Sequence, residues 1–142
     1  YHGPGQIMGY PIFDLDNFFT DINLYLRKLE EVIINTLDSY NLIGFTIKGE
    51  TGVWVKDRHG LSKKICAFGI RASRWVTMHG LCLNVDPDLS FFSHIIPCGI
   101  QDKGITSLKE MKKEDIDINE VKSRLVENFR LVFNAEISFE LN

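Results

Sequence analysis

The stretch KKICAFGIRASRWVTMHGLCLNVD (63–86) is rich in β-branched, aromatic and other apolar residues, and glycine and an Arg-Ala-Ser break interrupt it. Short apolar runs bounded by such residues are typical of β-strands. We interpret KKICAFGIR, RWVTMHG and LCLNVD as separate strands. With the upstream runs IGFTIK and TGVWV, residues 42–86 predict four or five strands of an antiparallel sheet, with a hairpin turn at DRHG (57–60).

Residues 17–40, which precede these strands, have the apolar spacing of a helix with one buried face. The apolar positions are Phe18, Phe19, Ile22, Leu26, Leu29, Val32, Ile33 and Leu37. Asp16 and Thr20 are the candidates for the N-cap, because a short side-chain oxygen can accept a hydrogen bond from an otherwise unpaired amide.

Residues 117–134 predict a second long helix, capped by Asp115 or Asp117. Its shared face consists of Ile118, Val121, Leu125, Phe129 and Val132 or Phe133. Residues 87–95 predict a short helix, because Pro87 suits a first helical turn. Two further strands are expected, one near Ile12–Leu15 and one in the alternating tail at 135–141.

Two long helices and an antiparallel or mixed sheet predict an α+β fold in which the helices pack on the sheet. The 142 residues, 44% of them hydrophobic, suffice for one domain over 1–142. No apolar run approaches the roughly 18 residues that a membrane span needs, and no secretory signal pattern is visible. The net charge of −3 argues against a nucleic-acid binder, which carries a basic face.

The three cysteines are Cys66, Cys82 and Cys98. An odd number argues against a disulfide framework, and no CxxC or His-x-x-x-His pair indicates a metal site, so we expect free thiols in a reducing cytosol. Cys98 lies between Pro97 and Gly99, which suit an exposed tight turn. From this turn alone an inert thiol is the commoner case, and a nucleophile is the alternative.

Lys63 and Lys64 are adjacent in a predicted strand, so their side chains face opposite sides. One of them is then turned inward, although two solvated lysines are the commoner arrangement. An inward Lys64 beside Cys98 would form a dyad, in which the ammonium favours the thiolate and the neutral amine accepts a proton.

Two histidines and two glycines are further candidates for a site. His2 and His79 each precede a glycine. Each is a candidate for a general base, although a histidine whose ring orients a loop is the commoner case. Gly69 and Gly80 lie in or beside strands, where glycine marks a bulge or room for a ligand. Neighbouring apolar residues Ala67, Phe68, Leu81 and Cys82 would line an acyl-sized slot or an ordinary core. No phosphate-binding glycine motif is present.

Five motifs in order resemble the lipoyl(octanoyl) transferase family: YHGPGQIMGYPI, GETGVWV, KKICAFGIR, SRWVTMHGLCLNVDPDLSFF and IIPCGIQDKGITSL. The resemblance runs from Tyr1 to about Leu108. It implies an α+β fold like that of the catalytic modules of biotin and lipoate protein ligases. It also implies an acyltransferase that moves an octanoyl (or lipoyl) group from acyl-carrier protein to a lysine of a lipoyl domain, through a cysteine thioester, as the first step of protein lipoylation.

The same resemblance implies roles for individual residues. Cys98, in the PCG motif, is implied as the nucleophile, and Lys64, which opens K-I-x-x-x-G, as its dyad partner. The implied acyl-binding residues are Tyr1, His2, Ala67, Phe68, Gly69, Gly80, Leu81 and Cys82. His79 and Asn84 are candidates for residues that position the reacting groups without reacting themselves.

No cofactor is implied on the enzyme, because the octanoyl donor carries phosphopantetheine on acyl-carrier protein. The implied acceptors are lipoyl domains of 2-oxoacid dehydrogenase complexes and the glycine cleavage H protein, with no nucleic acid or membrane partner, in a bacterial cytoplasm. Family members carry an Arg-Gly-Gly segment and a further region before the first motif, so we expect 1–142 to be an N-terminally incomplete catalytic domain. Two alternatives stay open: an ATP-dependent lipoate or biotin protein ligase, and a non-catalytic carrier-binding module.

Overall fold

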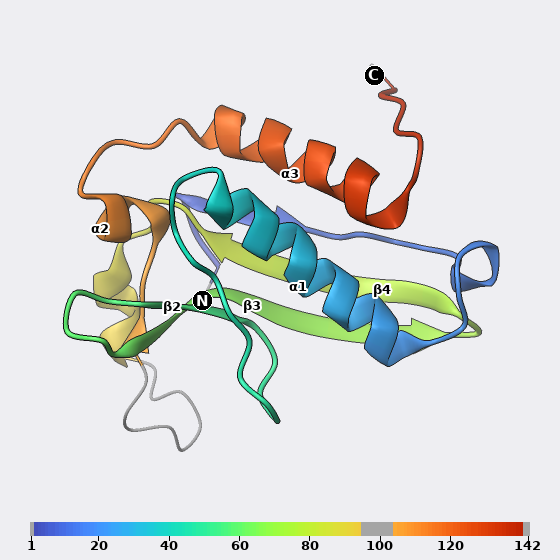
Figure 1. Ribbon diagram of the computed structural model, residues 1–142, viewed down its shortest axis with the longest axis horizontal. Helices are drawn as coiled ribbons and strands as arrows, with labels where there is room; N and C mark the ends of the chain where they lie inside the picture. The colour runs from blue at the N-terminus through green and yellow to red at the C-terminus, as the bar shows by residue number, and fades with distance from the viewer. Residues whose placement is uncertain (1, 95–103, 141–142) are drawn as a thin grey trace.

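The computed structural model describes residues 2–94 and 104–140. Helices α1 (Ile22–Asp38) and α3 (Ile118–Phe133) lie side by side over one face of a sheet (Figure 1). This is the α+β arrangement that the sequence predicts. No helix within the described ranges is long and apolar enough to cross a membrane.

The sheet has four antiparallel neighbours in the order β1-β4-β3-β2. Their bounds are β1 Gln6–Gly9, β2 Val53–Lys56, β3 Ser62–Ser73 and β4 Val76–Asn84. A fifth strand, β5 (Gly104–Ile105), pairs in parallel with Lys63 and Lys64 of β3. The sheet is therefore mixed, although all but its shortest strand are antiparallel.

Residues 62–84 form one long hairpin of two strands, where three strands were predicted. β3 and β4 pair without a break from Ser73 and Val76 down to Cys66 and Leu83. Between them Arg74 and Trp75 both have positive φ, as a two-residue hairpin turn requires. The predicted boundary after Gly80 was wrong, because this glycine pairs with Gly69 inside the ladder instead of ending a strand.

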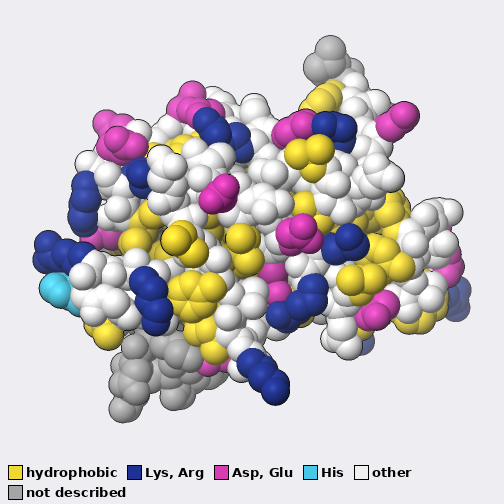
Figure 2. Space-filling model, viewed as in Figure 1, with side chains coloured by type: hydrophobic (Ala, Val, Ile, Leu, Met, Phe, Trp, Pro, Cys, Tyr) yellow, Lys and Arg dark blue, Asp and Glu magenta, His cyan; other side chains and the backbone are white. Residues whose placement is uncertain are grey.

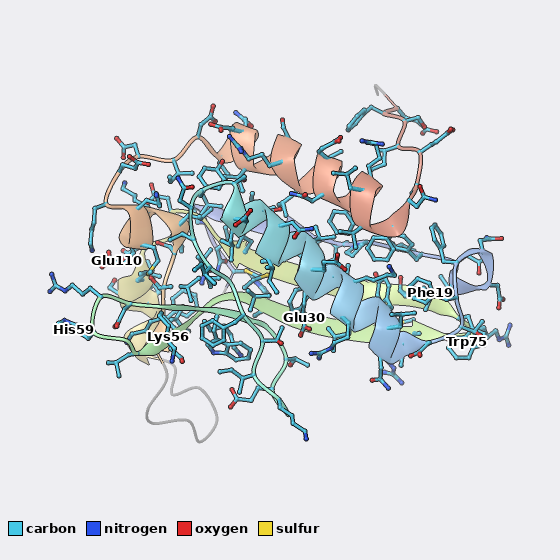
Figure 3. All side chains as sticks on the ribbon, viewed as in Figure 1. Phe19, Glu30, Lys56, His59, Trp75 and Glu110 are labelled. Atoms are coloured by element: carbon cyan, nitrogen blue, oxygen red, sulfur yellow. The ribbon has the colours of Figure 1, made fainter. Side chains whose placement is uncertain are left out.

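The turn predicted at residues 57–60 is confirmed as the connection between β2 and β3. The Asp57 carboxylate accepts hydrogen bonds from the amides of Leu61, at 2.9 Å, and His59, at 2.8 Å. These bonds, the one from Leu61 first, hold the pKa of Asp57 below its usual value. His59 at this turn and Trp75 in the other hairpin lie at opposite ends of the sheet (Figure 3).

Helix α1 begins later than the apolar pattern predicts. Asp21 is its N-cap, with Oδ1 accepting a hydrogen bond from the Leu24 amide at 3.0 Å. The predicted caps Asp16 and Thr20 were wrong, because a short 3-10 turn, η1 (Leu15–Asn17), and an irregular segment precede the helix. Phe18 and Phe19 therefore lie outside it. The buried apolar residues of α1 are Tyr25, Leu29, Val32, Ile33 and Leu37.

Helix α3 confirms the second predicted helix and one of its two candidate caps. The Asp117 carboxylate accepts a hydrogen bond from the Asn119 amide at 2.9 Å. The buried residues of α3 are Val121, Leu125 and Phe133, all from the predicted face. Acidic and basic side chains are interspersed on the face of the molecule that carries the helices (Figure 2).

The predictions for the shorter elements differ from the structure. Strand β1 occupies a segment assigned to a loop, and the strand expected near Ile12–Leu15 was wrong, since only an isolated bridge joins Asp14 to Val76 there. Residues 135–140 form no strand, because α3 carries the tail away from the sheet edges (Figure 1). The helix predicted at 87–95 is a 3-10 helix, η2 (Leu89–His94). The short helix α2 (Leu108–Lys112) and strand β5 were not predicted.

Candidate active site

A cavity of about 620 Å³ lies against β1, β3 and β4. Successive side chains of a strand point to opposite faces. Along β3, Phe68 and Ile70 pack against the core beneath the helices, whereas Ala67 and Gly69 alternate with them and are exposed. The cavity therefore opens on the face of the sheet that α1 and α3 leave free.

This one cavity gathers every implied acyl-binding residue within the described ranges. These residues are His2, Ala67, Phe68, Gly69, Gly80, Leu81 and Cys82, and His79 lines the cavity with them. They come from the N-terminal turn and from two strands, and antiparallel pairing of β3 with β4 brings them together. Tyr1, the remaining residue of the set, lies outside the described residues. The acyl-binding role of the set stays a prediction.

Gly69 and Gly80 pair with each other across β3 and β4, but the space around them differs. A Cβ added to Gly69 would meet nothing within 4 Å. A Cβ added to Gly80 would collide with the carbonyl oxygen of Gly9, where β1 approaches β4 closely. Gly80 is thus required by backbone packing, while Gly69 leaves volume open in the cavity.

His79 lies in β4 with a positive φ of 63°. This left-handed conformation is uncommon for a residue with a side chain, and it is found more often at functional sites than elsewhere. It places the strained residue directly before the tightly packed Gly80, on the wall of the cavity.

Lys64 lies on β3 with its ammonium 4.9 Å from the centre of the Trp54 ring. Trp54 is buried on the neighbouring strand, directly opposite Lys64. Gly52, with φ of +130°, makes room for the lysine stem, because a Cβ there would lie 3.2 Å from Lys64 Cε and 2.8 Å from the carbonyl oxygen of Cys66. Lys63 instead lines a separate cleft with Arg58. The two adjacent lysines thus contact different surroundings.

The three cysteines are not equally suited to act as a nucleophile. Burial raises the pKa of the Cys66 thiol well above its usual value, and burial also raises that of Cys82. Because the thiolate is the reactive form, such thiols are weak nucleophiles at neutral pH. Cys98 lies outside the described residues, and its role and its pairing with Lys64 stay predictions.

The chain matches the family described as "Lipoyl protein ligase A/B catalytic domain" over residues 1–130. The chain belongs to this family. The family resemblance predicted from the five motifs is therefore confirmed.

Two relatives within the family are proteins named octanoyltransferase. The chain is 55% identical to one from Christiangramia forsetii over 99% of its length, and 57% identical to one from Flavobacterium johnsoniae over 96% of its length. It covers 60% of each of these proteins. The chain therefore spans less than two thirds of the length of these relatives.

Solved structures of lipoate and biotin protein ligases have the same fold. A bipartite lipoate protein ligase from Thermoplasma acidophilum superposes with a TM-score of 0.78 at 18% identity, over 99% of this chain and 56% of that one. A biotin protein ligase from Aquifex aeolicus superposes with a TM-score of 0.67 at 19% identity, over 92% and 53%. At these identities the likeness shows the fold alone, and it confirms the fold that the resemblance implies.

Sequence reasoning missed part of the cavity wall of this lipoyl ligase A/B domain. Met8, Tyr10, Ile70 and Arg71 also line the cavity. Met8 was missed because β1 was assigned to a loop. Strand alternation could have identified Arg71, because Arg71 lies two residues beyond Gly69 and therefore points to the same side of β3.

Proposed function

We propose that this domain is the catalytic part of an octanoyltransferase. It takes an octanoyl (or lipoyl) group from acyl-carrier protein as a thioester on Cys98 and passes it to a lysine of a lipoyl domain. The observation that carries this proposal is the cavity of about 620 Å³ that gathers the residues implied in acyl binding. Its volume falls in the range of about 300–1,000 Å³ that is usual for small-molecule sites.

The identity of 55–57% with proteins named octanoyltransferase supports the same reaction. The cavity wall supports it as well, because Ala67, Cys82 and Met8, which are paired across β3, β4 and β1, are apolar or weakly polar and suit an alkyl chain. The raised thiol pKa values of Cys66 and Cys82 leave Cys98 as the cysteine suited to covalent catalysis.

In the first step, Lys64 accepts the proton of the Cys98 thiol, and the thiolate attacks the carbonyl carbon of the donor thioester. The bond from that carbon to the phosphopantetheine sulfur breaks, and Lys64 returns the proton to the leaving thiolate. The acyl group is then held on Cys98 as a new thioester, while the donor leaves as a free thiol.

In the second step, the amine of the acceptor lysine attacks the acyl thioester on Cys98. Lys64 accepts the proton that the amine loses as the amide bond forms, and the bond from carbon to the Cys98 sulfur breaks. Lys64 then returns this proton to the Cys98 thiolate, which restores both groups.

The wider proposal names acyl-carrier protein as donor and lipoyl domains of 2-oxoacid dehydrogenase complexes and the glycine cleavage H protein as acceptors. The enzyme needs no cofactor of its own, because the donor brings phosphopantetheine. We place the reaction in the bacterial cytoplasm, since the relatives are bacterial proteins and a reducing compartment keeps thiols free.

The test is to incubate the full-length protein that contains this domain with octanoyl-acyl-carrier protein and to record its intact mass. We expect one octanoyl increment that is absent from Cys98→Ser. Cys82→Ala is the matched control, because it removes a thiol from the cavity wall and should leave the increment in place. No increment, or one that Cys98→Ser retains, would sink the proposal.

Two further measurements on the same full-length protein separate the two alternatives. An acyl-adenylate formed from ATP and free octanoic acid would identify an ATP-dependent ligase. Binding of a lipoyl domain without any acyl transfer, unchanged in Lys64→Ala and Cys98→Ala, would identify a carrier-binding module.

A further inference from the structure

A chain of hydrogen bonds runs from the N-terminal turn to the backbone of Lys64. The Gly3 amide donates to Gln6 Oε1 at 2.9 Å, and Gln6 Nε2 donates to Asn84 Oδ1 at 2.8 Å. Asn84 Nδ2 donates to the carbonyl oxygen of Thr106 at 3.1 Å. The Thr106 amide in turn donates to the carbonyl oxygen of Lys64 at 3.0 Å. We call this chain the amide relay.

The orientations of the two side-chain carboxamides in the amide relay depend on each other. A carboxamide has one accepting and one donating end. Since Gln6 accepts from Gly3, its donating end faces Asn84, and Asn84 must then donate to Thr106. Asn84 and Thr106 are 6% and 3% exposed, so water does not readily replace these bonds. The relay therefore specifies one arrangement of its members.

Thr106 needs such support because the strand before it is very short. β5 is a two-residue strand, paired with Lys63 and Lys64 of β3. The Asn84 side chain attaches Thr106 to β4 as well, so the backbone carrying Lys64 is held from two strands. At its other end, the relay holds the turn at Gly3, next to His2 on the cavity wall.

We infer that Asn84, together with Gln6, is a positioning residue for acyl transfer. It keeps Thr106 against Lys64 and so sets the place of the proton-transferring lysine relative to the cavity. This inference rests on the proposed function. Neither Asn84 nor Lys64 is among the residues that line the cavity, and Asn84 reaches the Lys64 backbone through Thr106, so its effect acts through the position of Lys64 rather than by contact with the acyl chain.

The first test variant is Asn84→Asp in the full-length protein. It keeps the size of the side chain and the oxygen that faces Gln6, but it replaces the donor to Thr106 by an acceptor. We expect kcat for acyl transfer to fall about tenfold to a hundredfold, as for a misplaced reacting group, with KM for the donor near its wild-type value. The Thr106 amide should exchange its hydrogen faster.

The pH dependence of kcat tests the lost donor directly, provided that it is recorded only where circular dichroism shows Asn84→Asp to be fully folded, because a buried carboxylate also destabilises the fold less as it is protonated. When the carboxyl introduced by Asn84→Asp is protonated, it can donate to Thr106 again. The ratio of the variant rate to the wild-type rate should therefore rise as the pH is lowered. Asn128→Asp is the matched control, since Asn128 Nδ2 donates to Thr36 Oγ1 at 3.0 Å between α3 and α1, away from the cavity. It should lower Tm without changing kcat.

Gln6→Glu tests the relay from β1 if Asn84→Asp does not fold. It sets a carboxylate oxygen against Asn84 Oδ1. The Gly5 carbonyl still accepts hydrogen bonds from the amides of Val85 and Asp86, directly after β4, and so keeps this segment in place. The same loss of kcat is expected. Wild-type kcat in a folded variant would overturn the inference, as would unchanged exchange at Thr106. If the wild-type protein forms no acyl thioester, the proposed function fails, and unchanged exchange would still overturn the relay.

Discussion

The ammonium of Lys64 lies over the ring of Trp54, 4.9 Å from its centre, and the two residues are directly opposite each other on β3 and β2. A cation over an aromatic face is stabilised by about 0.5–2 kcal/mol. Because the Trp54 ring is buried, it is a fixed platform for a side chain that would otherwise be flexible. The position of Lys64 is therefore set by its neighbours as well as by its strand.

Lys64→Arg should separate this structural contact from proton transfer. Arginine also stacks on aromatic rings but does not lose its proton in proteins, so the fold should persist while the base is lost. We expect Tm close to that of the wild type and a rate of thioester formation lower by about a hundredfold or more. Single-turnover mass spectrometry measures this rate. Lys63→Arg is the control and should transfer normally, and normal transfer by Lys64→Arg would contradict the proton role.

Gly69→Leu should change which acyl chains the cavity accepts. A side chain at Gly69 enters open space, so it fills the cavity without straining the sheet. We expect the ratio of kcat/KM for octanoyl over butanoyl donors to fall at least about tenfold, with little change in Tm. Gly80→Ala should behave in the opposite way, because its methyl group collides with the Gly9 carbonyl and overpacking typically costs about 1–3 kcal/mol of stability. An unchanged octanoyl preference in Gly69→Leu would place the acyl chain elsewhere.

His79→Gly and His79→Ala should differ in stability but not in transfer. The positive φ of His79 strains any residue with a Cβ, and glycine relieves a strain of about 1–2 kcal/mol. We therefore expect His79→Gly to have the higher free energy of unfolding in urea. Both variants lack the imidazole, and with Lys64 as the base both should form the acyl thioester. Equal loss of transfer in two folded variants would instead assign a chemical role to the imidazole.

Glu30→Gln should flatten the pH dependence of stability. Glu30 lies between α1 and the sheet (Figure 3), 1% exposed, with Arg27 Nη1 2.8 Å from its Oε2. Burial raises the pKa of this carboxyl above its usual 4.5, although the Arg27 charge and the Gly52 amide lower it in part. The folded chain thus holds this proton at pH values where the unfolded chain has lost it. The contribution of Glu30 to the free energy of unfolding consequently falls as the pH rises from about 4.5 through the folded pKa.

Thermal unfolding between about pH 4 and pH 8 measures this effect. We expect the Tm of Glu30→Gln to vary less across the range and to equal or exceed that of the wild type at the alkaline end. Glu31→Gln is the matched control, because Glu31 is exposed on the same helix and should leave the pH profile unchanged. A lower Tm for Glu30→Gln at alkaline pH would mean that the charged pair with Arg27 outweighs the burial of the carboxylate.

The sequence was sufficient for features that depend on local pattern. The apolar spacing at 17–40 and 117–134 predicts both long helices, because a helix must bury one face, and Asp117 is one of the two caps predicted for the second helix. Apolar runs likewise predict an antiparallel sheet after the first helix, although the predicted strand IGFTIK forms only an isolated bridge from Phe45 to Trp54. Many of the residues that line the cavity were identified from motifs, most of them on two strands that antiparallel pairing then brings to one place.

Tertiary structure alone decided where strands continue and which distant side chains meet. Gly80 was interpreted as a strand end, yet it pairs with Gly69 inside the ladder, and it is glycine because β1 approaches it too closely for a Cβ. Gln6 and Asn84 are 78 positions apart, and Asn84 and Thr106 are 22 apart, so no local period relates them. Their bonds exist because the fold brings β1, β4 and the end of β5 together, and because Asn84 and Thr106 are buried where water does not readily replace a missing partner.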